Sequence, residues 1–152
     1  MSLEIERKFL VTNDSYRAVA EEVHTIEQAY ISTDADATVR VRLVDGRGFL
    51  TVKSRNVGAV RHEWEYEIPA EDAAQMLSTV CRSGHIAKTR YVVPAGGGLR
   101  WEVDEFHGRL APLVVAEIEL PGEDAAFDRP SFIGEEVTGD PRYFNSALAA
   151  QA

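Results

Sequence analysis

Hydrophobic and polar residues alternate with a period of two along most of this chain, which is the pattern of β-strands that bury one face. The alternating segments predict eight strands, at about 3–11, 25–33, 37–44, 48–55, 60–68, 86–93, 98–106 and 113–120. Asp45-Gly46 separates two of them and favours a two-residue hairpin, in which both turn residues need a positive φ. Three glycines at 96–98 indicate a looser hairpin. We therefore expect a largely antiparallel sheet.

Three other segments have helical features. Residues 13–15 offer caps for a helix that runs to about residue 23, and Pro69 precedes an alanine-rich stretch to about residue 82. A short third helix is expected over 142–150, after a Gly-Asp-Pro turn. No linker or internal repeat divides the chain, so its 152 residues predict one domain, 1–152.

Most charged residues of the predicted strands share one parity, with Arg7 and Glu105 as exceptions, while Val, Ile, Leu and Trp occupy the other. In chain order they are Glu4, Glu6, Lys8, Arg40, Arg42, Lys53, Arg55, Arg61, Glu63, Glu65, Glu67, Lys88, Arg90, Arg100, Glu102, Asp104, Glu117 and Glu119. One such strand would be the solvated side of a half-buried sheet. Seven of them, in a set of eight strands that is large enough to close, predict a barrel with the charges inside.

The fold class that follows is α+β, an eight-stranded antiparallel closed β-barrel with a charged interior and helices packed outside. The second strand is the exception to the common parity. It contains Gln28 and Tyr30 and is too mixed in polarity for its inward face to be assigned.

The charge of the chain narrows the choice of partners. Sixteen Lys and Arg residues against 25 Asp and Glu give a net charge of −9. This argues against nucleic acid or an anionic membrane as a partner, because both attract a positive surface. The single cysteine, Cys81, excludes an intramolecular disulfide. The charged N-terminus lacks the apolar core of a signal peptide, and no run approaches ~18 apolar residues. We therefore expect a cytoplasmic protein without a membrane partner.

A barrel interior this rich in carboxylates needs countercharges. Two like charges ~4 Å apart repel by about 4 kcal/mol at an effective dielectric constant of ~20. Carboxylate oxygens without His or Cys favour hard divalent ions such as Mg²⁺ or Mn²⁺. The interleaved Arg and Lys residues, Arg55 among them, supply donors for phosphate oxygens. The interior therefore suits a divalent metal together with a polyphosphate.

Several segments also resemble a known family. Residues 4–9 read Glu-Ile-Glu-Arg-Lys-Phe, an ExExK signature, and further matches lie at 38–42, 50–53, 63–69, 88–91, 101–104, 116–120, 136–140 and 143–145. In this order and parity they resemble the CYTH or triphosphate tunnel metalloenzyme family, especially its short bacterial members. The resemblance implies an eight-stranded tunnel that binds a triphosphate and cleaves it with a divalent metal.

The resemblance also implies roles for individual residues. Glu4, Glu6 and Glu119 are similar to the ligands of a first metal ion, with Glu102, Asp104 and Glu117 in supporting or metal-binding roles. Lys8, Arg40, Arg42, Lys53, Lys88 and Arg90 are similar to the clamp that holds the triphosphate, and Lys8, Arg40 and Lys53 are expected to act in catalysis. Glu63 and Glu65 are similar to the acidic pair that holds a second metal or orients the attacking water. Glu67 has the same parity, so the pair could instead be Glu65 and Glu67.

The short chain favours hydrolysis of inorganic tripolyphosphate to pyrophosphate and phosphate, with two Mg²⁺ or Mn²⁺ ions per site. Three alternatives stay open: a class IV-type adenylyl cyclase, a thiamine or nucleoside triphosphatase, and a non-catalytic module that binds polyphosphate or nucleotide. The sequence does not identify the physiological triphosphate or the metal. It also leaves open whether the protein is a homodimer.

Overall fold

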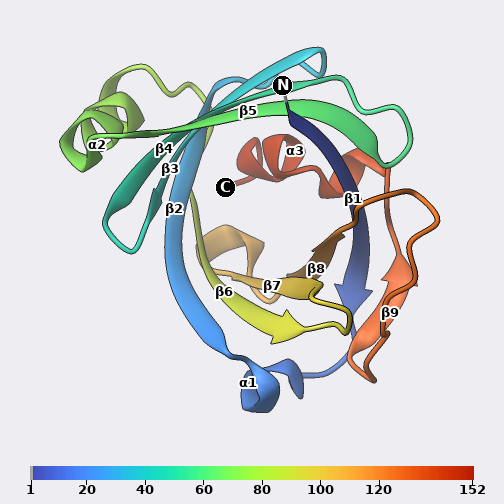
Figure 1. The fold of residues 1–152 in the computed structure, drawn as a ribbon. Coiled ribbons are helices and arrows are strands. Elements are labelled where there is room, and N and C mark those ends of the chain that lie inside the picture. The colour runs from blue at the N-terminus through green and yellow to red at the C-terminus, as the bar shows by residue number, and fades with distance from the viewer. Residues whose placement is uncertain (1) are drawn as a thin grey trace.

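Eight strands form a closed antiparallel barrel in this computed structural model, which describes residues 2–152 (Figure 1). The barrel strands are β1 (Ser2–Val11), β2 (Glu22–Ser32), β3 (Ala37–Val44), β4 (Arg47–Ser54), β5 (Val60–Ile68), β6 (Ile86–Pro94), β7 (Arg100–Phe106) and β8 (Val114–Glu119), and a ninth strand, β9 (Ile133–Glu136), pairs with β1. Their order is β5-β4-β3-β2-β6-β7-β8-β1-β9, and β5 also pairs with β1 to close the ring. The predicted barrel is therefore confirmed.

The hairpin between β3 and β4 is also confirmed, since Asp45 has φ 49° and Gly46 φ 83°. The strand β9 was not predicted. It has only four residues and pairs with β1, with Phe9 opposite Glu136 and Val11 opposite Ile133. A segment this short carries too little alternation to be recognised from its pattern.

The first predicted helix is wrong in length. Helix α1 (Tyr16–Val19) has four residues, and β2 begins at Glu22. Residues 22 and 23 pair with Val92 and Tyr91 of β6, so the hydrogen bonds of the sheet replace those of the expected helix.

The other predicted helices lie near their expected positions. They are α2 (Ala70–Thr79) and α3 (Asn145–Ala149), with 3₁₀ turns η1 (Gly108–Leu110) and η2 (Pro141–Tyr143). Helix α2 packs on the outside of β3 and β4 through Ala73 and Leu77. A Cβ at Gly48 would lie 2.8 Å from the Cβ of Ala73, so glycine permits this close approach. A second part of the outside is covered by the segment before β9, whose Phe127 and Phe132 pack in the cluster of Trp101.

Helix α3 differs from the expectation that all helices pack outside. We call η2 and α3 together the C-terminal cap. Leu148 of this cap packs on side chains of the inward parity, among them Tyr30, Phe106 and Val115. Figure 1 shows α3 within the outline of the barrel. These inward residues are apolar at this end, and burying them under the cap removes that surface from water.

The register also assigns the face of β2, because Gln28 and Tyr30 share the inward parity. None of the helices within residues 2–152 has the length and apolar character needed to cross a membrane.

Candidate active site

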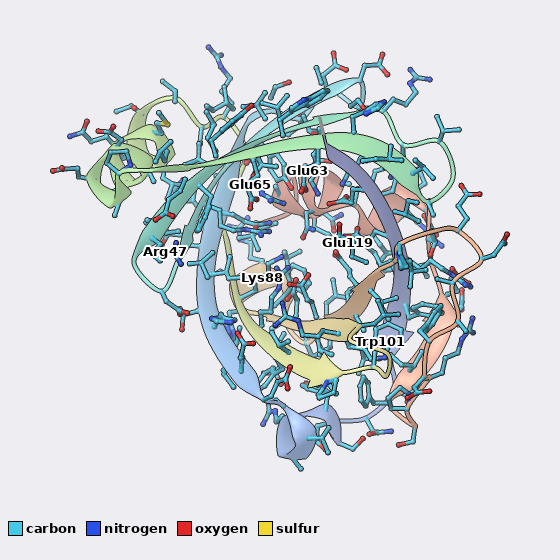
Figure 2. All side chains as sticks on the ribbon, in the orientation of Figure 1. Arg47, Glu63, Glu65, Lys88, Trp101 and Glu119 are labelled. Atoms are coloured by element: carbon cyan, nitrogen blue, oxygen red, sulfur yellow. The ribbon has the colours of Figure 1, made fainter. Side chains whose placement is uncertain are left out.

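A cavity of about 160 Å³ lies inside the barrel, and every residue that lines it is charged or an amide. Seven are carboxylates, five are Lys or Arg, and one is Asn: Glu4, Glu6, Arg40, Arg42, Lys53, Arg61, Glu63, Glu65, Arg90, Glu102, Glu117, Glu119 and Asn145. Figure 2 shows Glu63, Glu65 and Glu119 pointing into the barrel, whereas Arg47 points away from it. The shared parity of the charged residues therefore does bring most of them into one cavity.

Charges of opposite sign come from two different arcs of the strand ring. The acidic wall is formed by four strands that neighbour one another in the ring and consists of Glu102 and Asp104 (β7), Glu117 and Glu119 (β8), Glu4 and Glu6 (β1), and Glu63 and Glu65 (β5). The basic wall consists of Arg40 and Arg42 (β3), Lys53 (β4), and Lys88 and Arg90 (β6). Lys8 and Arg61 are cations that stand within the acidic wall.

The acidic wall contains like charges directly opposite one another on adjacent strands. Glu6 pairs with Glu119, and Glu102 pairs with Glu117. Such pairs are destabilising in a sheet unless a cation lies between them. Burial, Glu117 and Glu4 raise the pKa of Glu6 well above its ordinary value. Burial, Glu4 and Glu102 likewise raise the pKa of Glu119. This wall therefore has a deficit of positive charge.

Lys53 joins the two walls. Its Nζ lies 3.2 Å from Glu4 Oε1 and 3.1 Å from Glu63 Oε2, and Arg61 Nε lies 3.4 Å from the same Glu4 oxygen. Burial would raise the pKa of Glu4, but Lys53, a hydrogen bond with Glu63, and Arg61 outweigh it and lower the pKa to about 2. Burial and the hydrogen bond with Glu4 raise the pKa of Glu63 to about 7.

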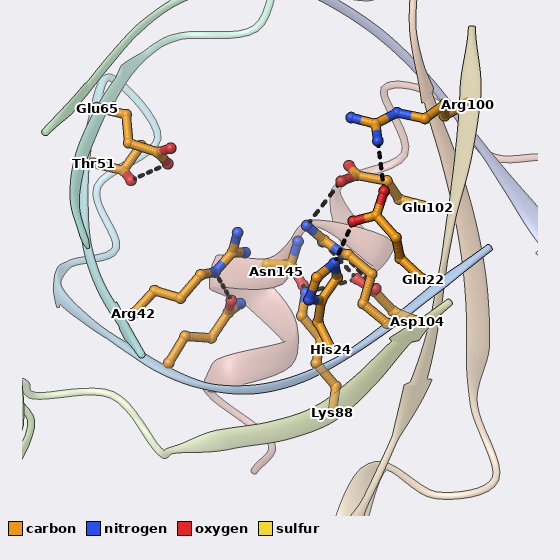
Figure 3. A network of polar contacts seen from close by, with 12 residues as sticks. Glu22, His24, Arg42, Thr51, Glu65, Lys88, Arg100, Glu102, Asp104 and Asn145 are labelled. Carbon is orange, nitrogen blue, oxygen red and sulfur yellow. Dashed lines mark hydrogen bonds and ion pairs between the residues drawn. The ribbon is translucent and has the colours of Figure 1, made fainter. Parts of the chain in front are cut away.

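Asp104 holds two cations of the basic wall (Figure 3). Arg90 donates to both Asp104 oxygens, from Nε at 2.8 Å and from Nη2 at 2.9 Å, and Lys88 Nζ lies 2.7 Å from Oδ2. Burial would raise the pKa of Asp104, but Arg90 and Lys88 lower it to about 2. Burial lowers the pKa of Lys88 to about 7, against the attraction of Asp104. The network fixes Arg90 at the edge of the cavity.

The two arginines of β3 have donors directed into the barrel. Arg42 Nε donates to Gln28 Oε1 at 2.7 Å, and burial, with Arg40 and Arg90 nearby, lowers the pKa of Arg42 to about 9. Arg40 Nη2 donates to Thr51 Oγ1 at 3.2 Å. Arg40 Nε is buried and has no hydrogen-bond partner within residues 2–152. A bound oxyanion could accept from such a group.

Two residues of the right parity lie away from the cavity. Arg55 follows the end of β4 and pairs with Asp36 at the surface. Glu67 pairs with Arg47 in an exposed contact of 2.6 Å. Glu63 and Glu65 both line the cavity, so of the two alternatives for the acidic pair only this one lies wholly at the site. Parity gives the face of a strand, but not where along the barrel the cavity ends.

Two lining residues received no site role from the sequence. Arg61 was placed on the inward parity with the other charges, but no role followed from that. Asn145 lies in the C-terminal cap, where no alternation indicates what a side chain faces. Lys8 and Lys88, which were predicted, are buried next to the cavity, and both contact the cap.

The acidic wall fits a hard divalent cation by its chemistry, since all its donors are carboxylate oxygens. Within the described part of the chain, no three acidic, histidine or cysteine side chains form a ready metal cluster. Mg²⁺ commonly uses only one or two carboxylates and completes its shell with waters and substrate phosphates. The neighbouring carboxylates of the acidic wall can supply these one or two ligands, and a bound cation would relieve the repulsion between them.

Comparison with known proteins identifies close relatives. The CYTH domain family model matches residues 2–144. An inorganic triphosphatase of Acetivibrio thermocellus is 49% identical over 148 residues, which are 97% of this chain and 94% of that protein. An inorganic triphosphatase of Nitrosomonas europaea is 39% identical over 151 residues, which are 96% of each chain.

Solved structures agree with these sequence relatives. The crystal structure of the inorganic triphosphatase NE1496 has a TM-score of 0.68 and 35% identity, covering 100% of this chain and 97% of that one. HpAC1 from Hippeastrum, an adenylyl cyclase candidate with a dominant triphosphatase activity, has a TM-score of 0.61 and 18% identity, covering 78% of this chain and 80% of that one. At that identity the likeness shows the fold alone.

Proposed function

The chain belongs to the CYTH domain family, and from this premise we propose that it is a metal-dependent inorganic triphosphatase that hydrolyses tripolyphosphate to pyrophosphate and phosphate. The observation that carries the proposal is the separation of charge in the cavity. A basic wall attracts a polyphosphate, whereas an acidic wall alone would repel it. Divalent ions between the acidic wall and the phosphates remove that conflict. The cavity thus suits a triphosphate and metal bound together.

The acidic wall would hold the metal. We assign the ligand role to Glu4, Glu6, Glu117 and Glu119, with Glu102 beside them. When bound there, Mg²⁺ or Mn²⁺, two ions per site in our proposal, would offset the phosphate charge and lower the pKa of the attacking water.

The basic wall would hold the triphosphate. Arg40, Arg42, Lys53 and Arg90 line the cavity, and each charge-assisted hydrogen bond from them would contribute about 1.5 to 3 kcal/mol. Lys8, Lys88 and Asp104 would act from just behind this lining. The resemblance implied either a supporting or a metal-binding role for Asp104. We propose the supporting role, in which Asp104 orients Arg90 and Lys88.

The pair Glu63 and Glu65 lies on β5, between the acidic strand β1 and the basic strand β4. Glu65 Oε2 accepts a hydrogen bond from Thr51 Oγ1 at 2.9 Å, and Glu63 is held by Lys53. Fixed carboxylates at the junction of the two walls can accept hydrogen bonds from a water directed at the terminal phosphate. We propose that they orient this water in line with the bond that breaks.

One observation favours an organic triphosphate as the second candidate substrate. A neighbouring cavity of about 220 Å³ shares Arg42, Glu65, Arg90 and Glu102 with the main one. Its other lining residues are Glu22, His24 and Arg100 and the apolar Ile26, Val44, Phe49 and Val92. This apolar surface could contact a nucleoside or thiamine group attached to the phosphates.

The deciding experiment measures phosphate release from tripolyphosphate, ATP, thiamine triphosphate and pyrophosphate, each with Mg²⁺, Mn²⁺ or EDTA. We expect rapid, EDTA-sensitive cleavage of tripolyphosphate and slow cleavage of the other three. The ATP reaction is also analysed by chromatography for cyclic AMP, the product of a cyclase. Tight triphosphate binding without turnover under any metal would instead identify a binding module, and preference for an organic triphosphate would favour the second candidate.

A further inference from the structure

The C-terminal cap is anchored by contacts outside the charged cavity. Leu148 and Ala149 pack on the apolar end of the barrel interior. The backbone N–H of Gly84 donates to the Ala149 carbonyl at 3.1 Å. A Cβ at Gly84 would lie 2.7 Å from that oxygen, so the two backbones are in close contact. The cap therefore forms a fixed floor for the cavity.

Asn145, the first residue of α3, reaches from this floor to a buried lysine (Figure 3). Lys88 Nζ donates to Asn145 Oδ1 at 3.4 Å and lies 2.7 Å from Asp104 Oδ2. The side chain of Lys88 is 0% exposed, and Asn145 lines the cavity. An ammonium has three N–H donors, so one carboxylate does not fix the direction of all of them. Asn145 Oδ1 is a second acceptor, and with two acceptors the orientation of the ammonium is fixed.

Lys8 is held in a similar way. Its Nζ donates to the backbone carbonyl of Tyr143 at 2.9 Å and lies 3.5 Å from Glu117 Oε1. For both lysines the barrel contributes a carboxylate and the cap contributes a neutral oxygen. A neutral acceptor orients an ammonium without cancelling its charge. The cap therefore orients each lysine without adding a second negative charge to that of its carboxylate.

We propose that Asn145 is a positioning residue that orients the Lys88 ammonium toward the triphosphate. This inference rests on the proposed function and extends the clamp to a residue outside the barrel strands. The cap then belongs to the phosphate site as well as to the fold. Because the contact from Tyr143 is made by its backbone, Asn145 is the position at which a side-chain substitution tests the idea.

The test is a double-mutant cycle on tripolyphosphate hydrolysis with Asn145→Ala, Lys88→Met and the double variant. Asn145→Ala should lower kcat/KM about tenfold, the size expected for one hydrogen bond to a charged group. In the Lys88→Met background the same substitution should change kcat/KM less than about twofold, because the group that it positions is gone. Gln151→Ala, an exposed site two residues beyond the cap, is the control and should behave as wild type.

Asn145→Asp separates orientation from charge. It keeps an acceptor near Lys88 but adds a second negative charge beside that of Asp104, so KM for tripolyphosphate should rise by a larger factor than kcat falls. Wild-type kinetics for Asn145→Ala would overturn the inference. So would an equal loss in the presence and absence of Lys88, since that is the result of a purely structural role.

If the proposed function is wrong, the wild-type protein will not hydrolyse tripolyphosphate, and this result is distinct from any effect of Asn145. In that case the same cycle is measured by calorimetric titration with tripolyphosphate. Loss of affinity in Asn145→Ala that disappears in the Lys88→Met background would still support the positioning role. Absence of coupling would overturn it.

Discussion

Two ion-pair networks have nearly equal contact distances. Lys88 and Asp104 of one and Glu22, His24 and Arg100 of the other lie in the same part of the barrel (Figure 3). The wall network is Asp104, Lys88 and Arg90, with contacts of 2.7 and 2.8 Å. The rim network is Glu22, His24, Asp45 and Arg100, with Arg100 2.9 Å from Glu22 and His24 2.6 Å from Asp45. The side chains of Lys88 and Asp104 are 0% and 2% exposed, whereas those of Arg100 and Glu22 are 56% and 43% exposed.

The difference between them is therefore burial and not distance. In the wall network Lys88 and Asp104 have lost their water, so removing one partner leaves another charge buried and uncompensated. In the rim network water and salt can replace any partner that is removed. We expect the wall network to determine both stability and substrate binding. The rim network should contribute little to stability or to the binding of tripolyphosphate.

The largest effect is expected from Asp104→Asn, which removes the shared anion of the wall network with little change in shape. Breaking a buried ion pair in this way costs about 3 to 5 kcal/mol of unfolding free energy. Arg90 and Lys88 should also lose their orientation, so kcat/KM for tripolyphosphate should fall at least about 100-fold, or ~2.7 kcal/mol. Urea denaturation and steady-state kinetics measure the two losses.

The exposed Asp124 provides a control, because Asp124→Asn makes the same chemical change where the structure has no ion pair within residues 2–152. Equal unfolding free energies for the two variants would show that the wall network is not a major source of stability.

A smaller loss is expected from Arg90→Lys, which keeps the charge of the wall network but cannot make the two-point contact with Asp104. We expect about tenfold lower kcat/KM, or ~1.4 kcal/mol, and a smaller loss of stability than for Asp104→Asn. Arg82→Lys at the exposed surface is the matched control. If Arg90→Lys retained full activity, charge alone and not the geometry of the guanidinium would account for the clamp.

The rim network should respond weakly to Arg100→Ala. The exposed contact with Glu22 is expected to contribute about 0.2 to 1 kcal/mol to unfolding free energy, and less in high salt. Thermal melts at low and high ionic strength, with Arg109→Ala as the control, measure this contribution. Arg109 is exposed and has no ion pair in the described residues. A loss as large as that of Asp104→Asn would contradict the distinction between wall and rim.

The inward charges of the strands could be predicted from the sequence, because parity identifies the inward face of a strand, as it does for Glu117 and Glu119. It could not predict the two walls, since these depend on which strands become neighbours in the ring. Arg55 shares the inward parity but lies just past its strand, where the pleat no longer directs it. Asn145 has no pattern at all, because its position is determined by the packing of Leu148 in the barrel end.

The smallest effect is expected from His24→Asn, and it should depend on pH. Hydrogen bonding to Asp45, opposed by burial and supported by Glu22, raises the pKa of His24 above its ordinary value of about 6.5. A raised folded-state pKa means that the stabilisation is complete below ~6.5 and is lost as pH rises through the folded pKa. The variant should therefore melt up to about 2 °C lower than wild type at pH 6, and show a smaller difference at pH 9.

Asp45→Asn makes this last test specific to the rim network. Asn can still accept the hydrogen bond that Thr25 N–H donates to Asp45 Oδ1, and it tolerates the positive φ at this position. In that background the pH dependence of His24→Asn should largely disappear, because the anion that stabilises the charged imidazole is gone. An unchanged pH dependence would place the electrostatic partner of His24 elsewhere. Disappearance of the pH dependence would show that the rim network responds to protons through the contact between His24 and Asp45.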